Sequence, residues 1–155
     1  MPKTPLDEKI ATAFIVAGCL IEKDSKYLLI QEKSPEIAGL WSIPIGKVEK
    51  GMKIAETAIK EVKEETGFDV ELKRKIGIYH KDDDMSVKHI FEAKIIGGEL
   101  NIPEDEIQDA RWYDYHEIEC LKELGKLRSN SVIVGINDLN RKRERTKLLK
   151  GLRLQ

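Results

Sequence analysis

Hydrophobic and polar positions along the chain follow two different periods. Short apolar runs rich in β-branched residues, bounded by polar turns and glycines, are typical of strands. Such runs predict strands at residues 10–21, 27–31, 70–79, 87–96 and 110–113. The polar turn at 22–25 predicts that the first two form a hairpin, and Pro44 marks a strand end because it has no amide hydrogen to donate.

The helical period appears in three other stretches. From Ile54 to Val62 the apolar positions recur about every 3.6 residues, and Gly67 is placed to end this helix. Residues 116–127 and 131–149 are the other two predicted helices. Strands interleaved with one early and two late helices predict an α/β (α+β) fold with a mixed sheet between helices. The order of the strands stays open at this point.

The length of 155 residues predicts one domain over 1–155, with residues 1–9 as a loose N-terminal arm. The N-terminus has no apolar core of a signal peptide, and no apolar run approaches the ~20 residues of a membrane helix. We therefore expect a cytoplasmic protein with no membrane partner. The two cysteines, Cys19 and Cys120, are predicted to be buried free thiols rather than a disulfide framework.

The chain has many charged residues, and they are unevenly distributed along the sequence. The 27 basic and 28 acidic residues give a net charge of -1, which argues against a general binder of polyanions. Residues 141–155 nevertheless hold seven basic residues and one acid, as a basic helix or tail. Nucleic-acid binding is the weaker interpretation of this tail because no aromatic residues are interleaved for base stacking. The favoured one is a solvated helix end whose leucines dock on the domain or on a second subunit of a homodimer.

Three glutamates on the first predicted helix carry the strongest chemical signal. Glu61, Glu64 and Glu65 fall within about 100° of one another on a helix, so we expect their carboxylates to converge. A bound divalent cation would turn their mutual repulsion into ligation, since Mg²⁺ prefers carboxylate oxygens. A solvated charged face is the alternative. The glycine loop from Gly46 to Gly51 favours the site, because such a loop before a helix can present backbone groups to phosphate or metal.

Residues 46–68, GKVEKGMKIAETAIKEVKEETGF, resemble the signature box of the Nudix hydrolases. The family pattern is Gly, five residues, Glu, seven residues, then Arg-Glu-aliphatic-any-Glu-Glu-any-Gly-aliphatic. The positions that fit are Gly46, Glu61, Val62, Glu64, Glu65 and Gly67, with Phe68 as the apolar end. Residues 40–44 and 104–113 resemble the segments before and after the box, so the resemblance covers most of 10–125.

The resemblance implies a Nudix-type α/β/α sandwich and a metal-dependent hydrolase. Members of the family cleave a nucleoside diphosphate linked to another moiety, by attack of water on phosphorus. Carried over by position, Glu61, Glu64, Glu65 and the carbonyl of Gly46 would hold Mg²⁺ or Mn²⁺. The general base lies in the box or on the later acidic loop, whose candidates are Glu104, Asp105 and Glu106, with Glu106 preferred.

Three further residues are candidates for substrate binding. Lys33 and Lys47 could meet substrate phosphates, and Trp41 could stack on a nucleobase. The alternatives are solvated lysines and a core tryptophan. A Pro past the box is frequent in family members that act on ADP-ribose, but Asp82–Asp84 stands there instead. This difference favours a nucleoside triphosphate or another small nucleotide as the substrate.

Two positions of the box depart from the family pattern. Met52 stands at the first Glu and Lys60 at the Arg. Met52 cannot accept a carboxylate's hydrogen bonds, and Lys60 lacks the planar fork of arginine, so we expect the two changes to be linked. The intact glutamates favour an active enzyme. The departures leave open a non-catalytic Nudix-like module that binds a nucleotide or effector.

Overall fold

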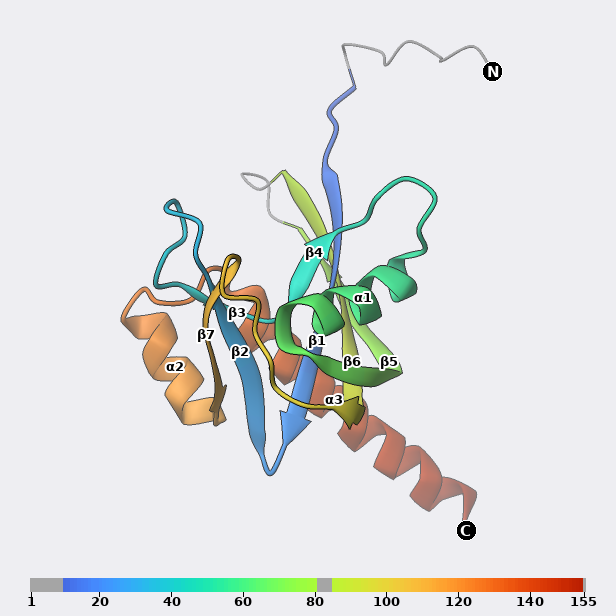
Figure 1. Cartoon of the computed structure of the whole chain (residues 1–155). Coiled ribbons are helices and arrows are strands. Elements are labelled where there is room, and N and C mark those ends of the chain that lie inside the picture. The colour runs from blue at the N-terminus through green and yellow to red at the C-terminus, as the bar shows by residue number, and fades with distance from the viewer. Residues whose placement is uncertain (1–9, 81–84, 155) are drawn as a thin grey trace, which may run out of the picture.

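The structure is a computed structural model that describes residues 10–80 and 85–154. The predicted arm at 1–9 and the Asp82–Asp84 turn lie outside the described residues. The described elements, in chain order, are β1 (Phe14–Lys23), β2 (Lys26–Glu32), β3 (Trp41–Ser42), β4 (Ile45–Lys47), α1 (Ile54–Thr66), β5 (Phe68–Tyr79), β6 (Ser86–Gly98), β7 (Ile107–Tyr113), α2 (Tyr115–Glu123) and α3 (Ser131–Arg153). They form a mixed sheet with helices on both faces (Figure 1), as the sequence predicts.

Two hydrophobic cores hold the three layers together. Successive residues of a strand point to opposite faces, so neighbours such as Leu28 and Leu29 enter different cores. Ala58 and Val62 of α1 pack on one face of the sheet, whereas Ile136 of α3 packs on the other. Burial of such side chains contributes roughly 1.5–3 kcal/mol each, which makes the two cores the main stabilising feature.

The β1–β2 hairpin is closed at one end and open at the other. The two strands pair directly only next to their turn, where Asp24 and Ser25 both have positive φ. At the open end β3 pairs with β2, and β4 pairs with β1. Residues 41–47 therefore pass between the splayed strands (Figure 1). This opening is where the candidate site lies.

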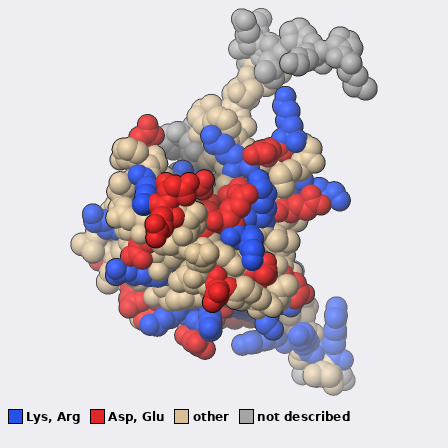
Figure 2. Space-filling model, in the orientation of Figure 1, with Lys and Arg blue, Asp and Glu red and all other residues tan. Residues whose placement is uncertain are grey.

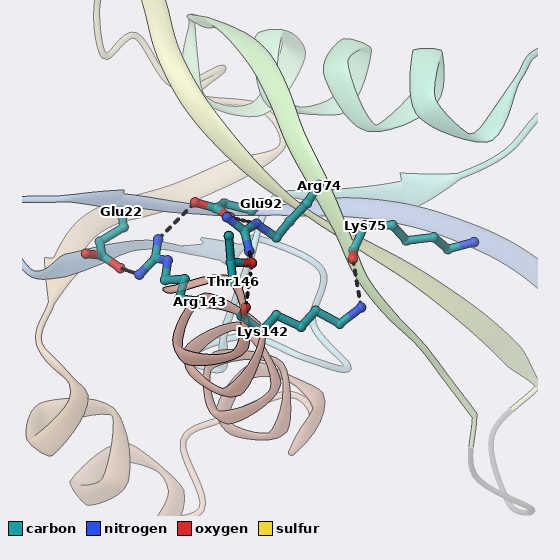
Figure 3. A network of polar contacts seen from close by, with 7 residues as sticks. All are labelled: Glu22, Arg74, Lys75, Glu92, Lys142, Arg143 and Thr146. Carbon is teal, nitrogen blue, oxygen red and sulfur yellow. Dashed lines mark hydrogen bonds and ion pairs between the residues drawn. The ribbon is translucent and has the colours of Figure 1, made fainter. Parts of the chain in front are cut away.

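A network of ion pairs fastens α3 to the sheet (Figure 3). Arg143 of α3 lies 2.8 Å from Glu22 of β1 and 3.0 Å from Glu92 of β6. Arg74 of β5 approaches the same Glu92 at 2.8 Å. Through these contacts one helical residue joins two strands, and the shared carboxylate joins a third.

The boundaries of several elements differ from those predicted. The first strand begins at Phe14 rather than at residue 10, and α2 ends at Glu123 because Gly125 turns the chain with φ of 68°. The end of α1 is confirmed, since Gly67 has φ of 83° and caps the helix. The buried face of α1 matches the predicted apolar stripe only in part, because Ala58 and Val62 are buried but Ile59 is exposed, and Glu65 joins the buried face.

The C-terminal part of α3 projects away from the sheet, with basic side chains clustered on it (Figures 1 and 2). Leu148, Leu149 and Leu152 are 65%, 47% and 58% exposed. The prediction that these leucines dock on the domain is therefore wrong, and docking on a second subunit stays a prediction. Cys19 is buried as expected, but Cys120 is exposed. Within the described residues, no helix has the length and apolarity needed to cross a bilayer.

Candidate active site

The site is built where α1 crosses β4. Gly46 lies in the middle of β4 and pairs with Ala17 of β1, which fixes its backbone beneath the helix. The carboxylate of Glu61 fills the space that a side chain at position 46 would need. Only glycine therefore lets this carboxylate lie directly against the β4 backbone. Partial burial is the main cause that raises the pKa of Glu61.

Glu65 lies one helical turn further along the same face and is only 5% exposed. Its Oε2 atom is buried and has no hydrogen-bond partner among the described residues. Burial, and then the neighbouring Glu61 carboxylate, raise the pKa of Glu65 to about 10. The buried Glu65 carboxyl thus lies beside the half-buried Glu61 carboxylate, and no ion pair joins either to a cationic side chain in the described part of the chain. A hard cation would neutralise such a pair.

Glu64 does not join the other two glutamates. Its carboxylate forms an ion pair with Lys60 at 3.4 Å on the solvent side of α1. In the described part of the chain, no three His, Cys, Asp or Glu side chains converge into a ready metal site. The structure therefore brings together Glu61, Glu65 and Gly46 but leaves Glu64 outside, contrary to the expected convergence of three carboxylates.

An open cavity of about 530 Å³ begins at Glu65 and leads to the loop before β7. Its lining includes Lys33 and Glu106, whose backbones are joined by a 2.9 Å hydrogen bond from Lys33 N to the Glu106 carbonyl. The negative charge of Glu106 also contributes to the raised pKa of Glu61. Figure 2 shows acidic side chains gathered over this face between α1 and the β7 loop. Among the loop acids, Glu104 lines a different cavity, whereas Asp105 and Glu106 both line this one, so the preference for Glu106 over Asp105 stays a prediction.

Sequence reasoning missed Glu32, the last residue of β2. Glu32 lines this cavity and a second one, and its charge also raises the pKa of Glu65. The available signal was a charged residue directly after the buried run of β2. Nothing in the sequence places that strand end beside α1, since the pairing of distant strands decides it.

The second cavity, of about 630 Å³, lies on the other side of Glu32. Gly46 and Lys47 form part of its lining, and Lys47 Nζ lies 4.2 Å from the centre of the Phe14 ring. Trp41 is only 6% exposed, so its ring is not accessible for stacking on a nucleobase. Its ring packs edge-on against Tyr113 at 5.0 Å. Its role is in the core, where a large aromatic ring stabilises the end of the hairpin.

Comparison with known proteins agrees with this geometry. The family model of the NUDIX domain matches residues 12–133. The chain belongs to the NUDIX family. The matched range contains both Gly46 and the three glutamates of α1, so the resemblance of the box reflects true membership.

Relatives within the NUDIX family carry different substrates in their names. An ADP-ribose pyrophosphatase of Methanocaldococcus jannaschii is 35% identical over 106 residues, which cover 66% of this chain and 62% of that protein. A putative 8-oxo-dGTP diphosphatase of Bacillus subtilis is 30% identical over 100 residues, covering 64% of this chain and 63% of that protein. The chain thus spans somewhat less than two thirds of each of these relatives.

Solved structures of the family share the architecture. A NUDIX hydrolase from Nitrosomonas europaea superposes with a TM-score of 0.74 at 25% identity, covering 84% of this chain and 90% of that one. An ADP-ribose pyrophosphatase from Streptococcus suis gives a TM-score of 0.57 at 28% identity, with coverage of 77% and 95%. The sandwich predicted for this NUDIX family member is confirmed.

Proposed function

We propose that this chain hydrolyses the phosphoanhydride bond of a nucleoside diphosphate linked to another moiety. The observation that carries the proposal is the corner of Gly46, Glu61 and Glu65, with its buried and unpartnered carboxylate oxygen. Membership of the NUDIX family and relatives named as pyrophosphatase and diphosphatase support it. A buried carboxylate oxygen without a hydrogen-bond partner is costly, so a merely structural helix face would not be expected to contain one.

The residues present suit a divalent cation such as Mg²⁺ or Mn²⁺. Glu61, Glu65 and the Gly46 carbonyl would hold it, with Glu64 joining only if it leaves Lys60. Mg²⁺ in phosphate-processing sites usually has one or two protein carboxylates, several waters and substrate phosphates as ligands, so this set is sufficient. A bound cation would supply charge neutralisation for the diphosphate and lower the pKa of an attacking water.

The surrounding residues would then orient the substrate and accept a proton. Lys33, in the cavity next to Glu65, is positioned to bind a diphosphate oxygen. Glu106 lines the same cavity and would take a proton from the attacking water, which is the role of a general base. Lys47 follows Gly46 directly and would meet the diphosphate from the side of the larger cavity.

The departures at Met52 and Lys60 support a second candidate, a Nudix-like module that binds nucleotides without cleaving them. In the structure Lys60 forms an ion pair with Glu64 on the helix surface, and the nearby loop carboxylate of Glu49 also contributes to the raised pKa of Lys60. The pair of the half-buried Glu61 and the buried Glu65 supports the enzyme, because carboxyl groups with raised pKa values are typical of catalytic sites.

A phosphate-release screen separates the two candidates. Nucleoside triphosphates, nucleotide sugars, ADP-ribose and dinucleoside polyphosphates are tested with Mg²⁺ or Mn²⁺, and a nucleoside triphosphate is the expected substrate. Glu65→Gln should abolish turnover. The exposed Glu56→Gln on the same helix is the matched control and should leave turnover unchanged. Tight nucleotide binding without turnover of any compound would instead identify a binding module.

A further inference from the structure

The C-terminal end of α3 has exposed charged and apolar surface. The hydroxyl oxygen of Thr146 lies 3.5 Å from a guanidinium nitrogen of Arg74 on β5. Past Thr146, no hydrogen bond or ion pair joins the helix to another element in the described part of the chain. Residues 147–154, which we call the basic tail, contain no acid but three cations and four exposed leucines (Lys147, Lys150, Arg153, Leu148, Leu149, Leu152 and Leu154).

Two cations of the basic tail continue a line of side chains that binds carboxylates further up the helix. Arg143 faces the sheet and forms ion pairs with the carboxylates of two strands. Lys147 and Lys150 follow it by four and seven residues, so they lie on the same side of α3. By then the helix projects away from the sheet (Figure 1). These lysines therefore have the orientation of Arg143 without any ion pair among the described residues.

A groove of opposite charge lies beside α1. It consists of two open cavities of about 510 and 580 Å³ that share Asn101 and Ile102 in their linings, and we call it the acidic groove. Leu100, which is 45% exposed, adds apolar surface. Two of the lining carboxylates are paired with cations of their own chain, but Glu99 and Glu104 are exposed and form no ion pair among the described residues. The charged lining residues are four carboxylates and two lysines (Glu64, Glu99, Glu104, Asp109, Lys33 and Lys63).

The acidic groove is formed within one copy of the chain, but the basic tail of that copy cannot enter it. The N–H of Asn101 donates to the carbonyl of Thr66 at 2.8 Å, which fixes the groove segment to the end of α1. The two helices pack on opposite faces of the sheet. Because α3 is continuous from Ser131 to Arg153 and Arg143 fastens it to the sheet, its end cannot fold back to α1. The occupant of the groove and the partner of the tail must be other molecules.

The arrangement of the leucines favours a protein groove over other partners for the tail. A bilayer takes up a helix whose apolar side chains share one face. Leu148 and Leu152 share a side of α3, but Leu154 is about 200° round the helix from Leu152, and cations stand between them. A groove contacts a helix from more than one side. Nucleic acid is disfavoured because no aromatic side chain is available for base stacking, and direct pairing of two α3 ends would bring like charges together.

We propose that the basic tail of one copy docks in the acidic groove of a second copy, with the leucines on the apolar lining and the cations on Glu99 and Glu104. A two-fold axis would use each tail and each groove once, so the dimer would contain this contact twice. The chain itself thus supplies both the charge and its complement. This inference does not depend on the hydrolase activity.

A charge swap tests the pairing of tail and groove. The tail variant combines Lys147→Glu with Lys150→Glu, and the groove variant combines Glu99→Lys with Glu104→Lys. Each variant alone places like charges opposite each other, so the dimer Kd from sedimentation velocity should rise at least about tenfold. In an equal mixture each tail meets a groove of opposite charge, so the Kd should return to within about threefold of the parent value. Exposed charges are screened by salt, so the parent dimer should also weaken at about 0.5 M NaCl.

A control variant separates a specific contact from the effect of net charge. Lys26→Glu with Lys122→Glu changes the net charge by the same amount at exposed positions outside the tail and should leave the dimer Kd unchanged. The thermal midpoint of each variant shows that it is folded.

Four results would overturn the inference. These are a parent chain that stays monomeric, a dimer that neither variant weakens, a control that weakens it equally, and a mixture that does not dimerise. Vesicles of phosphatidylcholine with about 30% phosphatidylserine test the lipid alternative. A monomeric parent that binds these vesicles, with binding lost in the tail variant, would assign the tail to a membrane surface instead.

Discussion

At the scale of single residues, Gly46 decides whether α1 can approach β4. The absent side chain leaves room for the Glu61 carboxylate, and Glu65 lies buried one helical turn further along. Ionising a carboxyl that is buried beside a second carboxylate is costly without a counter-ion, which is why the pKa of Glu65 is raised. The sequence sets this arrangement by placing glycine at one strand position and glutamates at two helical ones.

Replacing Gly46 with alanine should therefore disturb the site more than the fold. The new Cβ would collide with the Glu61 carboxylate, and a displacement of about 1 Å at a reacting centre typically costs roughly 100-fold in rate. We expect kcat/KM to fall by about that factor. Gly151→Ala is the control, because Gly151 lies on an exposed part of α3 with open space around it, and its activity should be unchanged. Similar activity of the two variants would refute the role given to Gly46.

At the scale of elements, the two departures of the box from the family pattern lie at the loop residue Met52 and the helix residue Lys60. Met52 offers no carboxylate to Lys60, and Lys60 pairs with Glu64 of its own helix. The linkage of the two departures stays a prediction, in which the Lys60–Glu64 ion pair takes the place of a contact between loop and helix.

The double change Met52→Glu and Lys60→Arg should restore the loop–helix contact and release Glu64. A bidentate arginine–carboxylate pair is stronger than a lysine contact, so we expect turnover and metal affinity to rise by roughly three- to tenfold. Lys60→Arg alone is the control and should give less than the pair. Steady-state kinetics over a range of Mg²⁺ concentrations measure both quantities. No rise in either would show that the supporting role is wrong for this chain.

Much of the fold and of the candidate site could be predicted from the sequence, and each wrong prediction has a physical cause. The period of α1 and the terminal Gly67 were predicted correctly because both are local signals. The orientation of Glu64 was not predicted, because helical spacing alone does not show that its carboxylate forms an ion pair with Lys60. Glu32 and Arg128 come together across 96 residues, a distance over which the pattern of one chain carries no pairing information.

Ion pairs of Arg143 attach α3 to the sheet. Arg143 forms ion pairs with two carboxylates, and the side chain of one of them, Glu92, is only 15% exposed. Arg143→Met should lower the free energy of unfolding by about 1–3 kcal/mol, since it leaves a largely buried carboxylate with one partner fewer. Arg141→Met, at a position that is 73% exposed, should cost less than about 1 kcal/mol. Urea denaturation measures both, and equal losses would refute the role of the network.

At the scale of the whole molecule, charged side chains are unevenly distributed over the surface (Figure 2). Acidic side chains gather near α1 and the β7 loop, and basic ones gather on the projecting end of α3 (Figure 2). The net charge of -1 is therefore an average of unlike parts. The acidic surface fits a cation site, so the composition reflects the function only after the fold has separated the charges.

Stability of the layered structure should depend on pH through Asp138. Tyr79 of β5 donates a 2.6 Å hydrogen bond to Asp138 of α3, and this bond is the main cause that holds the pKa of Asp138 below its usual 3.8. Because the folded pKa is lower than the unfolded one, the stabilisation is complete above the unfolded pKa and is lost as pH falls through the folded value.

The free energy of unfolding of the parent chain should thus exceed that of Asp138→Asn at pH 7. The difference should shrink as pH falls below about 4, where the aspartate takes up a proton. Urea denaturation from pH 7 to pH 3 follows both proteins. A difference that stays constant over this range would contradict the assigned pKa shift.

The central claim, that Gly46, Glu61 and Glu65 form a cation site, is tested most directly by Mn²⁺ binding. Electron paramagnetic resonance of free Mn²⁺ measures the Kd of the parent chain, of Glu65→Gln and of the exposed control Glu56→Gln. We predict binding by the parent and by Glu56→Gln with similar Kd, and at least tenfold weaker binding by Glu65→Gln. Equal binding by all three proteins, or no binding by the parent, would contradict the claim.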